Sequence, residues 1–220
     1  MTVKENGHQL KICEIFTSIQ GESSFAGIPC IFIRLTGCNL RCTYCDTQYA
    51  YYEGKEISED EIIRQVRCAG MNLTEITGGE PLLQRDVYSL IKKLIEEGHT
   101  VLIETNGSQN IKDIDKNAVV ILDVKTPGSG MHEKMDMSNL DLLKKNDEVK
   151  FVLTSRSDYE WSKEIIHRHK LTDRCGLLLS PAFGILPVEN LIQWMIKDKL
   201  QVRLNLQMHK YIFGSDRRGV

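Results

Sequence analysis

The chain has 220 residues, of which 41% are apolar and 26% are charged, and its formal net charge is −2. This length and composition are typical of one compact globular domain, 1–220, and argue against a disordered chain. The small net charge gives no bulk attraction to nucleic acid, and no stretch approaches the roughly 18 apolar residues of a membrane span. We therefore expect a cytoplasmic protein without a nucleic acid or membrane partner.

Predicted strands and helices alternate along most of the chain. Short apolar runs that end in glycine or polar residues predict strands at 10–16, 30–36, 73–77, 100–105, 119–123, 149–154 and 176–181. Apolar residues at helical spacing predict helices at 57–66, 86–98, 138–146, 157–170 and 188–198. Strands that are continuous apolar runs between helices indicate a parallel sheet covered by helices.

The alternation of strands and helices sets the fold class, which is α/β, and the number of units sets the architecture. There are too few units for an eight-fold barrel, so we expect a partial (β/α)6-type, TIM-like barrel. We assign 51–206 to the barrel, 207–220 to a C-terminal tail and 1–50 to an N-terminal segment that carries the cysteine motif described next. Ligands of such sheets bind at the carboxyl ends of the strands, so the polar residues there should converge on one site.

Three cysteines, Cys38, Cys42 and Cys45, form a CxxxCxxC pattern on one short segment. Thiolates favour zinc or iron–sulfur clusters, and structural zinc and ordinary four-iron clusters take four protein ligands. No fourth cysteine or histidine is close by, so we predict a [4Fe-4S] cluster whose fourth iron is open to a small molecule. The alternative is a closed zinc site, completed by a distant cysteine such as Cys13, Cys68 or Cys175.

The cysteine count also bears on the compartment. Seven cysteines, three of them assigned to a cluster, do not suggest a disulfide framework, which suits a reducing compartment. We expect the remaining four to be small buried hydrophobic side chains: Cys13, Cys30, Cys68 and Cys175.

Arg34 is a charge within an otherwise apolar predicted strand. Side chains alternate along a strand, so Phe32, Arg34 and Thr36 should share one face. The guanidinium could bind a substrate carboxylate through two parallel hydrogen bonds. It could equally form an ion pair at the surface.

The tetrapeptide Gly78-Gly79-Glu80-Pro81 follows a predicted strand. Glycines let the backbone approach a ligand closely, although alone the tetrapeptide could be a turn. CxxxCxxC and GGEP together resemble the radical S-adenosylmethionine enzymes, and the resemblance covers most of the chain. It implies a barrel of the radical SAM type, in which the open iron holds the amino and carboxylate groups of S-adenosylmethionine. One electron from the cluster then releases a 5′-deoxyadenosyl radical.

The same resemblance implies contacts with S-adenosylmethionine at several strand ends and at the loop that carries the three cysteines, residues 38–47, which we call the cluster loop. These positions are Tyr44, Asp46, Gly78, Gly79, Glu80, Asn106, Asp123, Val124, Lys125, Ser180, Pro181, Ala182 and Phe183. From the residues alone, Asp123 and Lys125 could instead form a surface ion pair.

Further motifs are similar to those of the 7-carboxy-7-deazaguanine synthases: TSIQGES, FIRLTGC, the CDT that ends the cluster loop, TGGEP and QMHKY. This resemblance implies radical ring contraction of 6-carboxy-5,6,7,8-tetrahydropterin to 7-carboxy-7-deazaguanine, with loss of ammonia, on the route to deazapurines such as queuosine. It also implies a homodimer and a flavodoxin- or ferredoxin-type electron donor.

The implied substrate contacts are Ile19, Gln20, Gly21, Glu22, Arg34, Thr77 and His209. Thr47 is implied as a ligand of Mg²⁺, which prefers oxygen donors. Two departures from the family pattern stand out. Met208 replaces a common threonine, and the chain continues through GSDRRGV, so a substrate contact made by a chain end in other members does not transfer.

Two other functions share part of this pattern. A glycyl-radical activase, which acts on a partner protein, would have the three cysteines and GGEP but would not need QGE or Arg34. A non-catalytic metal-binding module would hold zinc and would not cleave S-adenosylmethionine.

Overall fold

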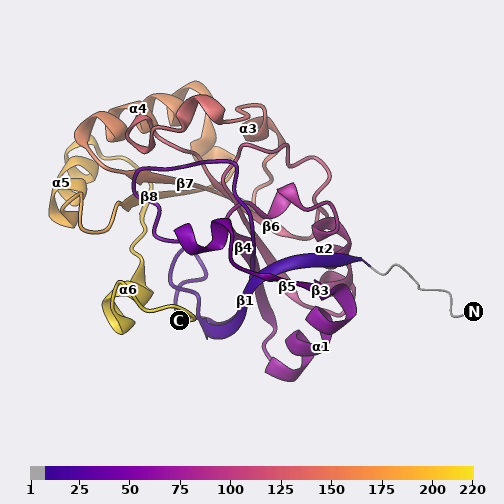
Figure 1. Cartoon of the computed structure of the whole chain (residues 1–220). Helices are drawn as coiled ribbons and strands as arrows, with labels where there is room; N and C mark the ends of the chain where they lie inside the picture. The colour runs from indigo at the N-terminus through magenta and orange to yellow at the C-terminus, as the bar shows by residue number, and fades with distance from the viewer. Residues whose placement is uncertain (1–7) are drawn as a thin grey trace, which may run out of the picture.

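A curved sheet organises residues 8–220, the part of the chain that the computed structural model describes (Figure 1). Within these residues it has nine strands in the order β3-β1-β2-β4-β5-β6-β7-β8-β9. Their bounds are β1 Gln9–Ile19, β2 Pro29–Leu35, β3 Lys55–Ser58, β4 Leu73–Gly78, β5 Thr100–Thr105, β6 Val119–Asp123, β7 Glu148–Leu153, β8 Gly176–Pro181 and β9 Arg203–Leu204. From β2 onward each neighbouring pair is parallel, which confirms the α/β fold with an unclosed barrel.

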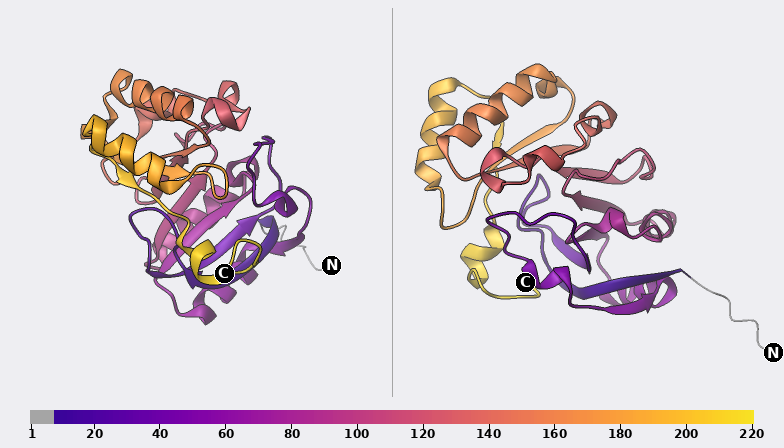
Figure 2. Two further views of the ribbon diagram at one scale, coloured as in Figure 1. Left: turned by 90° about the vertical axis from the view of Figure 1, so that its left-hand side faces the viewer. Right: turned by 45° about the horizontal axis from the view of Figure 1, so that its top comes forward.

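The helices cover the outside of this curve (Figure 2). They are α1 Glu59–Ala69, α2 Val87–Glu96, α3 Asn139–Leu142, α4 Arg156–Arg168, α5 Val188–Asp198 and α6 Met208–Phe213. Short 3-10 turns occupy η1 Gln48–Tyr51, η2 Pro81–Leu83, η3 Pro127–Ser129, η4 His132–Lys134 and η5 Leu171–Asp173. The helix α6 is the exception, because the C-terminal segment returns toward β1 (Figure 1). None of the helices in 8–220 has both the length and the apolar character needed to cross a bilayer.

Alternation along the strands separates the core from the barrel interior. On β2, Ile31, Ile33 and Leu35 pack beneath the helices, whereas Phe32 and Arg34 face inward. A second apolar cluster closes the amino end of the interior: Cys30, Phe32, Leu73, Leu102 and Ile121. The interior therefore changes from apolar to charged toward the carboxyl ends of the strands, where Glu75, Glu104, Asp123 and Lys150 lie.

The first two helices overlap the predicted 57–66 and 86–98 but run from Glu59 to Ala69 and from Val87 to Glu96, and a capping residue marks one end of each. Ser58 precedes α1, and its hydroxyl accepts a hydrogen bond from the amide of Glu61 at 3.3 Å. Gly98 follows α2 in the left-handed region, with a φ of +89°, as a helix-ending glycine does.

The predicted helix 138–146 is wrong beyond its first turn, because α3 ends at Leu142. Asp147 is the physical reason. Its carboxylate accepts hydrogen bonds from the amides of Lys144 at 2.8 Å and Val120 at 2.9 Å, so these residues form a turn that joins β6 instead of a helix.

The first strands depart from simple alternation of strands and helices. β1 pairs antiparallel with β2 and with β3, so no helix separates the first three strands. β2 is also the first parallel strand of the barrel, and the sheet therefore does not divide at residue 50. Among the four remaining cysteines, Cys30 is buried as predicted, but Cys68 is exposed on α1, and Cys13 and Cys175 are only partly buried.

Candidate active site

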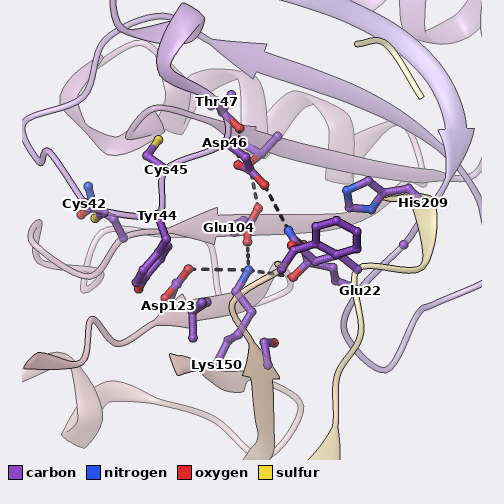
Figure 3. Close-up of a pocket in the computed structure, with 18 of the residues that line it drawn as sticks. Glu22, Cys42, Tyr44, Cys45, Asp46, Thr47, Glu104, Asp123, Lys150 and His209 are labelled. Atoms are coloured by element: carbon purple, nitrogen blue, oxygen red, sulfur yellow. Dashed lines mark hydrogen bonds and ion pairs between the residues drawn. The ribbon is translucent and has the colours of Figure 1, made fainter. Parts of the chain in front are cut away.

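One cavity of about 510 Å³ opens at the carboxyl ends of the strands (Figure 3). Its lining includes nearly all of the residues that the sequence singled out: Ile19, Gln20, Gly21, Glu22, Arg34, Cys38, Cys42, Tyr44, Cys45, Asp46, Thr47, Thr77, Gly78, Gly79, Asn106, Asp123, Lys125, Ser180, Pro181, Ala182, Phe183 and His209. Segments that are far apart in the sequence therefore converge on one site, as the strand-end argument predicts.

Two of the predicted residues do not line the cavity. Val124 is buried and packs in the main core. Glu80 is fully buried beneath the site, where its carboxylate accepts hydrogen bonds from the amides of Asn106 at 2.7 Å and Leu82 at 3.0 Å. Glu80 thus fixes the loops around the cavity, and burial raises its pKa to about 7.

The cluster loop is held by the loop that follows β6. The Thr43 amide donates to the carbonyl of Ser129 at 3.1 Å, and the Thr43 hydroxyl donates to the carbonyl of Gly128 at 2.8 Å. Gly128 is in turn fixed by Asp158 at the start of α4, whose buried carboxylate accepts the Gly128 amide at 2.8 Å. This chain of hydrogen bonds positions the stretch between Cys42 and Cys45.

The three thiols suit a soft metal cluster. Cys38, Cys42 and Cys45 are the cysteines of the cavity lining, and Cys13, Cys68 and Cys175 lie elsewhere, which gives no support to a closed zinc site. As they lie in residues 8–220, no three His, Cys, Asp or Glu side chains form a group that could hold a metal ion, so the fit rests on the softness of the thiols and on their shared cavity. Burial raises the pKa of Cys42 to about 11, so a cation is required to hold it as a thiolate.

The GGEP segment lies directly against the cluster loop. The Glu80 amide donates to the carbonyl of Gly37 at 2.7 Å. Gly78 has a φ of +150°, and a Cβ on Gly79 would come within 2.7 Å of the Cβ of Cys38. Both glycines are therefore required by the packing of this segment against Leu35 and the cluster loop.

Asp123 and Lys125 form an ion pair of 2.8 Å, but the pair is buried in the cavity wall and not on the surface. The Lys125 ammonium lies 5.9 Å from the centre of the Tyr44 ring. Within residues 8–220, Asp123 Oδ1 and the Tyr44 hydroxyl are buried without a hydrogen-bond partner. Two orphaned polar atoms beside the cluster loop fit a polar ligand at this position.

Arg34 is oriented by two residues that the sequence did not single out. Its Nε donates to Glu14 Oε1 at 2.7 Å, and the Tyr49 hydroxyl donates to the same oxygen at 2.9 Å. Glu14 lies opposite Arg34 in the antiparallel register of β1 and β2. Within residues 8–220, the Arg34 guanidinium makes no hydrogen bond other than the one from Nε. Its two terminal nitrogens are therefore left for a ligand in the cavity.

The opposite wall is tied together by Gln207, just before α6. Its amide nitrogen donates to Glu22 Oε1 at 3.1 Å and to Asp46 Oδ2 at 3.2 Å. Asp46 also pairs with Lys210, and although burial opposes its charge, this ammonium keeps the pKa of Asp46 well below its usual value. His209 packs against Gly21, and burial lowers its pKa, so a neutral imidazole faces the cavity.

Several further cavity residues were missed by the sequence reasoning: Glu75, Glu104, Lys150, Ser215, Asp216 and Val220. A signal for the first three was present, since each is a charge within an apolar strand, as Arg34 is. No local pattern indicates that the segment after α6 returns to the cavity. Arg218 anchors that segment, with its guanidinium 3.7 Å from the centre of the Tyr49 ring and an ion pair to Glu53 at 2.9 Å.

Comparisons with known proteins agree with this geometry. The profile of the radical SAM superfamily matches residues 32–168. A 7-carboxy-7-deazaguanine synthase of Koribacter versatilis is 42% identical, over 96% of this chain and 100% of the relative. One of Chlorobaculum tepidum is 43% identical, over 96% of this chain and 97% of the relative. The crystal structure of QueE from Escherichia coli shares the fold, with a TM-score of 0.77 at 24% identity over 91% of this chain and 95% of that one.

Three cysteines at one end of a partial barrel, a glycine-rich segment packed against them and similarity over 96% of the chain to two 7-carboxy-7-deazaguanine synthases lead to one assignment. The chain belongs to the radical SAM superfamily and, within it, to the 7-carboxy-7-deazaguanine synthases.

Proposed function

We propose that this chain converts 6-carboxy-5,6,7,8-tetrahydropterin to 7-carboxy-7-deazaguanine, with loss of ammonia. The observation that carries the proposal is the composition of the cavity at the carboxyl ends of the strands. It joins three thiols to an arginine with free terminal nitrogens and to buried carboxylates. In this cavity, a carboxylated heterocycle rich in N–H groups would find the arginine as a partner for its carboxylate and the protein carboxylates as acceptors for its ring.

Cys38, Cys42 and Cys45 would hold the [4Fe-4S] cluster, and the orphaned Tyr44 hydroxyl and Asp123 Oδ1 would lie beside S-adenosylmethionine. Bound together, the cluster and S-adenosylmethionine supply the carbon radical that starts the ring contraction. Gly78 and Gly79 would keep the backbone packed beside the cysteines, and the other predicted cofactor residues of the cavity lining would surround S-adenosylmethionine.

The chain itself would bind, orient and shield the substrate. Arg34 would hold the 6-carboxylate, while Gln20, Gly21, Glu22, Thr77 and His209 would surround the rings. A fixed orientation favours one rearrangement of a reactive species, and exclusion of water prevents its loss to side reactions. No general acid–base pair is needed for the radical step.

Mg²⁺ at Thr47 forms a finer part of the proposal. The Thr47 hydroxyl lies in the cavity lining and donates to Asp46 Oδ1 at 2.9 Å, so two oxygen donors are adjacent there. Replacement of Thr47 by valine should weaken the dependence of turnover on added Mg²⁺. An unchanged Mg²⁺ titration for Thr47→Val would exclude this ligand.

Exposed apolar side chains gather near the C-terminal end of the sheet, among them Phe183 and Tyr211, whose rings are in edge contact, with Ile185 and Ile212. They support a homodimer, which light scattering would test.

A flavodoxin or ferredoxin would supply the electron to the cluster, and a reducing cytoplasm suits this chain and its electron donor. The product would enter queuosine synthesis for tRNA modification.

The direct test is anaerobic incubation of cluster-loaded protein with S-adenosylmethionine, reductant, Mg²⁺ and the carboxylated pterin. Formation of 7-carboxy-7-deazaguanine without a protein partner supports the proposal and excludes a glycyl-radical activase. The variant Cys42→Ala should bind less iron and form no product. A stable zinc complex that does not cleave S-adenosylmethionine would instead identify a metal-binding module.

A further inference from the structure

A buried lysine holds together the charged floor of the cavity (Figure 3). Lys150 reaches the interior from β7, and only 5% of its side chain is exposed. Its ammonium pairs with Glu104 from β5 and lies 3.0 Å from Glu22 Oε2, which belongs to the segment after β1. A weaker contact of 3.6 Å reaches Asp123 on β6. One cation thus bridges carboxylates from three separate parts of the chain.

These carboxylates retain free acceptor capacity toward the cavity. In Glu104, Oε1 accepts from Lys150, and Oε2 accepts from the Thr77 hydroxyl at 2.9 Å. In Glu22, Oε2 accepts from Lys150 and from the Asn205 amide at 3.3 Å, and Oε1 accepts from Gln207. A carboxylate offers about four acceptor positions, so both residues can accept further hydrogen bonds from a ligand.

We infer that Lys150 is a positioning residue that fixes Glu22 and Glu104 as the acceptor pair for the N–H groups of the pterin. This inference rests on the proposed function. The 2-amino group, N3 and the two reduced ring nitrogens of a tetrahydropterin all carry hydrogens, so the ring needs acceptors. A protonated carboxyl group would present a donor of its own at one of these positions.

The electrostatics of the floor agree with this role. Although burial opposes ionisation, the Lys150 ammonium lowers the pKa of Glu104 to about 2. Glu75, which is buried farther from the cation, shows the opposite effect, since burial and the Glu104 charge raise its pKa well above the usual value. Without Lys150, the Glu104 charge would lose its neutralising partner while the buried Glu75 stays beside it, so the pKa of Glu104 would rise.

Groups from several elements face Glu104 and contribute to its titration. They are Arg34 on β2, Glu75 and Thr77 on β4, Asp123 on β6, Lys125 just after β6, Lys150 on β7, Glu22 after β1 and His209 on α6. Lys150 is the cation in direct contact with the carboxylate, so its removal should dominate the change.

The test is equilibrium binding of 6-carboxy-5,6,7,8-tetrahydropterin, measured anaerobically by calorimetry between pH 6 and 9. Binding to the wild type should be nearly flat, because Glu104 stays ionised throughout. In Lys150→Met the pKa of Glu104 rises, so binding at pH 6 should weaken at least about tenfold and recover as the pH increases. Lys150→Arg keeps the cation and should keep the flat profile.

Lys93→Met is the matched control, because it also removes the partner of a buried carboxylate, Glu59, at 2.8 Å, but between α1 and α2. It should lose stability and keep wild-type pterin binding. If Lys150→Met does not fold, Glu104→Gln must show weak binding without recovery at high pH. Wild-type affinity with a flat profile in Lys150→Met, or wild-type affinity in Glu104→Gln, overturns the inference. If the wild type itself neither binds nor converts the pterin, the proposed function fails instead.

Discussion

At the scale of single residues, Gly79 lies where the GGEP segment meets the cluster loop. A Cβ there would overlap the Gly37 carbonyl and the Cys38 side chain, both on the neighbouring loop. We predict that Gly79→Ala destabilises the fold by about 1–3 kcal/mol and displaces Cys38, so that less iron is retained after anaerobic reconstitution. Iron analysis together with urea denaturation measures both effects.

Gly98→Ala provides the control for that substitution. Gly98 has a φ of +89° and no neighbouring atom within 4 Å of the added Cβ. Its replacement should cost a similar amount of backbone strain, about 1–3 kcal/mol, far from the cavity. Equal loss of iron in both variants would show that Gly79 acts only through global stability.

Glu80 predicts a pH dependence of stability. Its pKa is about 7 in the folded protein and usually 4.5, so between these values the folded protein keeps a proton that the unfolded chain has released. Stability should therefore be highest below pH 4.5 as far as this group is concerned, and fall by about 3 kcal/mol as the pH rises to 7 and above. Urea denaturation of cluster-free wild type and Glu80→Gln at several pH values isolates the effect, since the variant lacks this decline. Parallel curves would contradict it.

At the scale of elements, the loop after β6 transmits the position of α4 to the cluster loop. Thr43→Val keeps the side-chain shape and removes the hydrogen bond to Gly128. Loss of one such bond costs about 1 kcal/mol, so a chelator should remove iron several-fold faster from the reconstituted variant. Thr172→Val, at an exposed position in η5, should behave as the wild type. Identical rates in both variants would show that Thr43 does not secure the loop.

Elements were predictable where one local pattern decided the outcome. β5, β6, β8 and α5 lie at the predicted residues, because their apolar periodicity and flanking glycines or polar residues agree. The short α3 was not predictable, since its end depends on Asp147 reaching the amide of Val120 on another strand. The antiparallel pairing of β1 with β2 also depends on contacts that a local pattern does not encode.

At the scale of the whole molecule, the segment after α6 covers one side of the cavity. Arg218 holds it against Tyr49 and Glu53, and Tyr49 in turn contacts Glu14, the partner of Arg34. An exposed cation–π contact and a surface ion pair each stabilise the segment weakly, so Arg218→Ala should weaken pterin binding only several-fold. Calorimetry on Arg218→Ala and on the control Arg217→Ala, which changes a neighbouring arginine that contacts only the Phe213 ring, would measure this. Equal affinities would show that the segment does not contribute to the site.

Much of the site could be inferred from the sequence, because the cluster loop and GGEP are contiguous motifs and strand ends meet at one edge of a sheet. Glu14, Glu104 and Lys150 could not be paired in advance, since their partnerships depend on sheet register and on which side chains share the barrel interior. The ion pair between Asp123 and Lys125 was one of the predicted alternatives. Its burial in the cavity wall was not predictable, because burial also depends on which side chains share the barrel interior.

The position of Val220 in the cavity lining has a practical consequence for expression and purification. A histidine tag fused after this residue would begin at the mouth of the site, where its imidazoles could compete for iron during reconstitution.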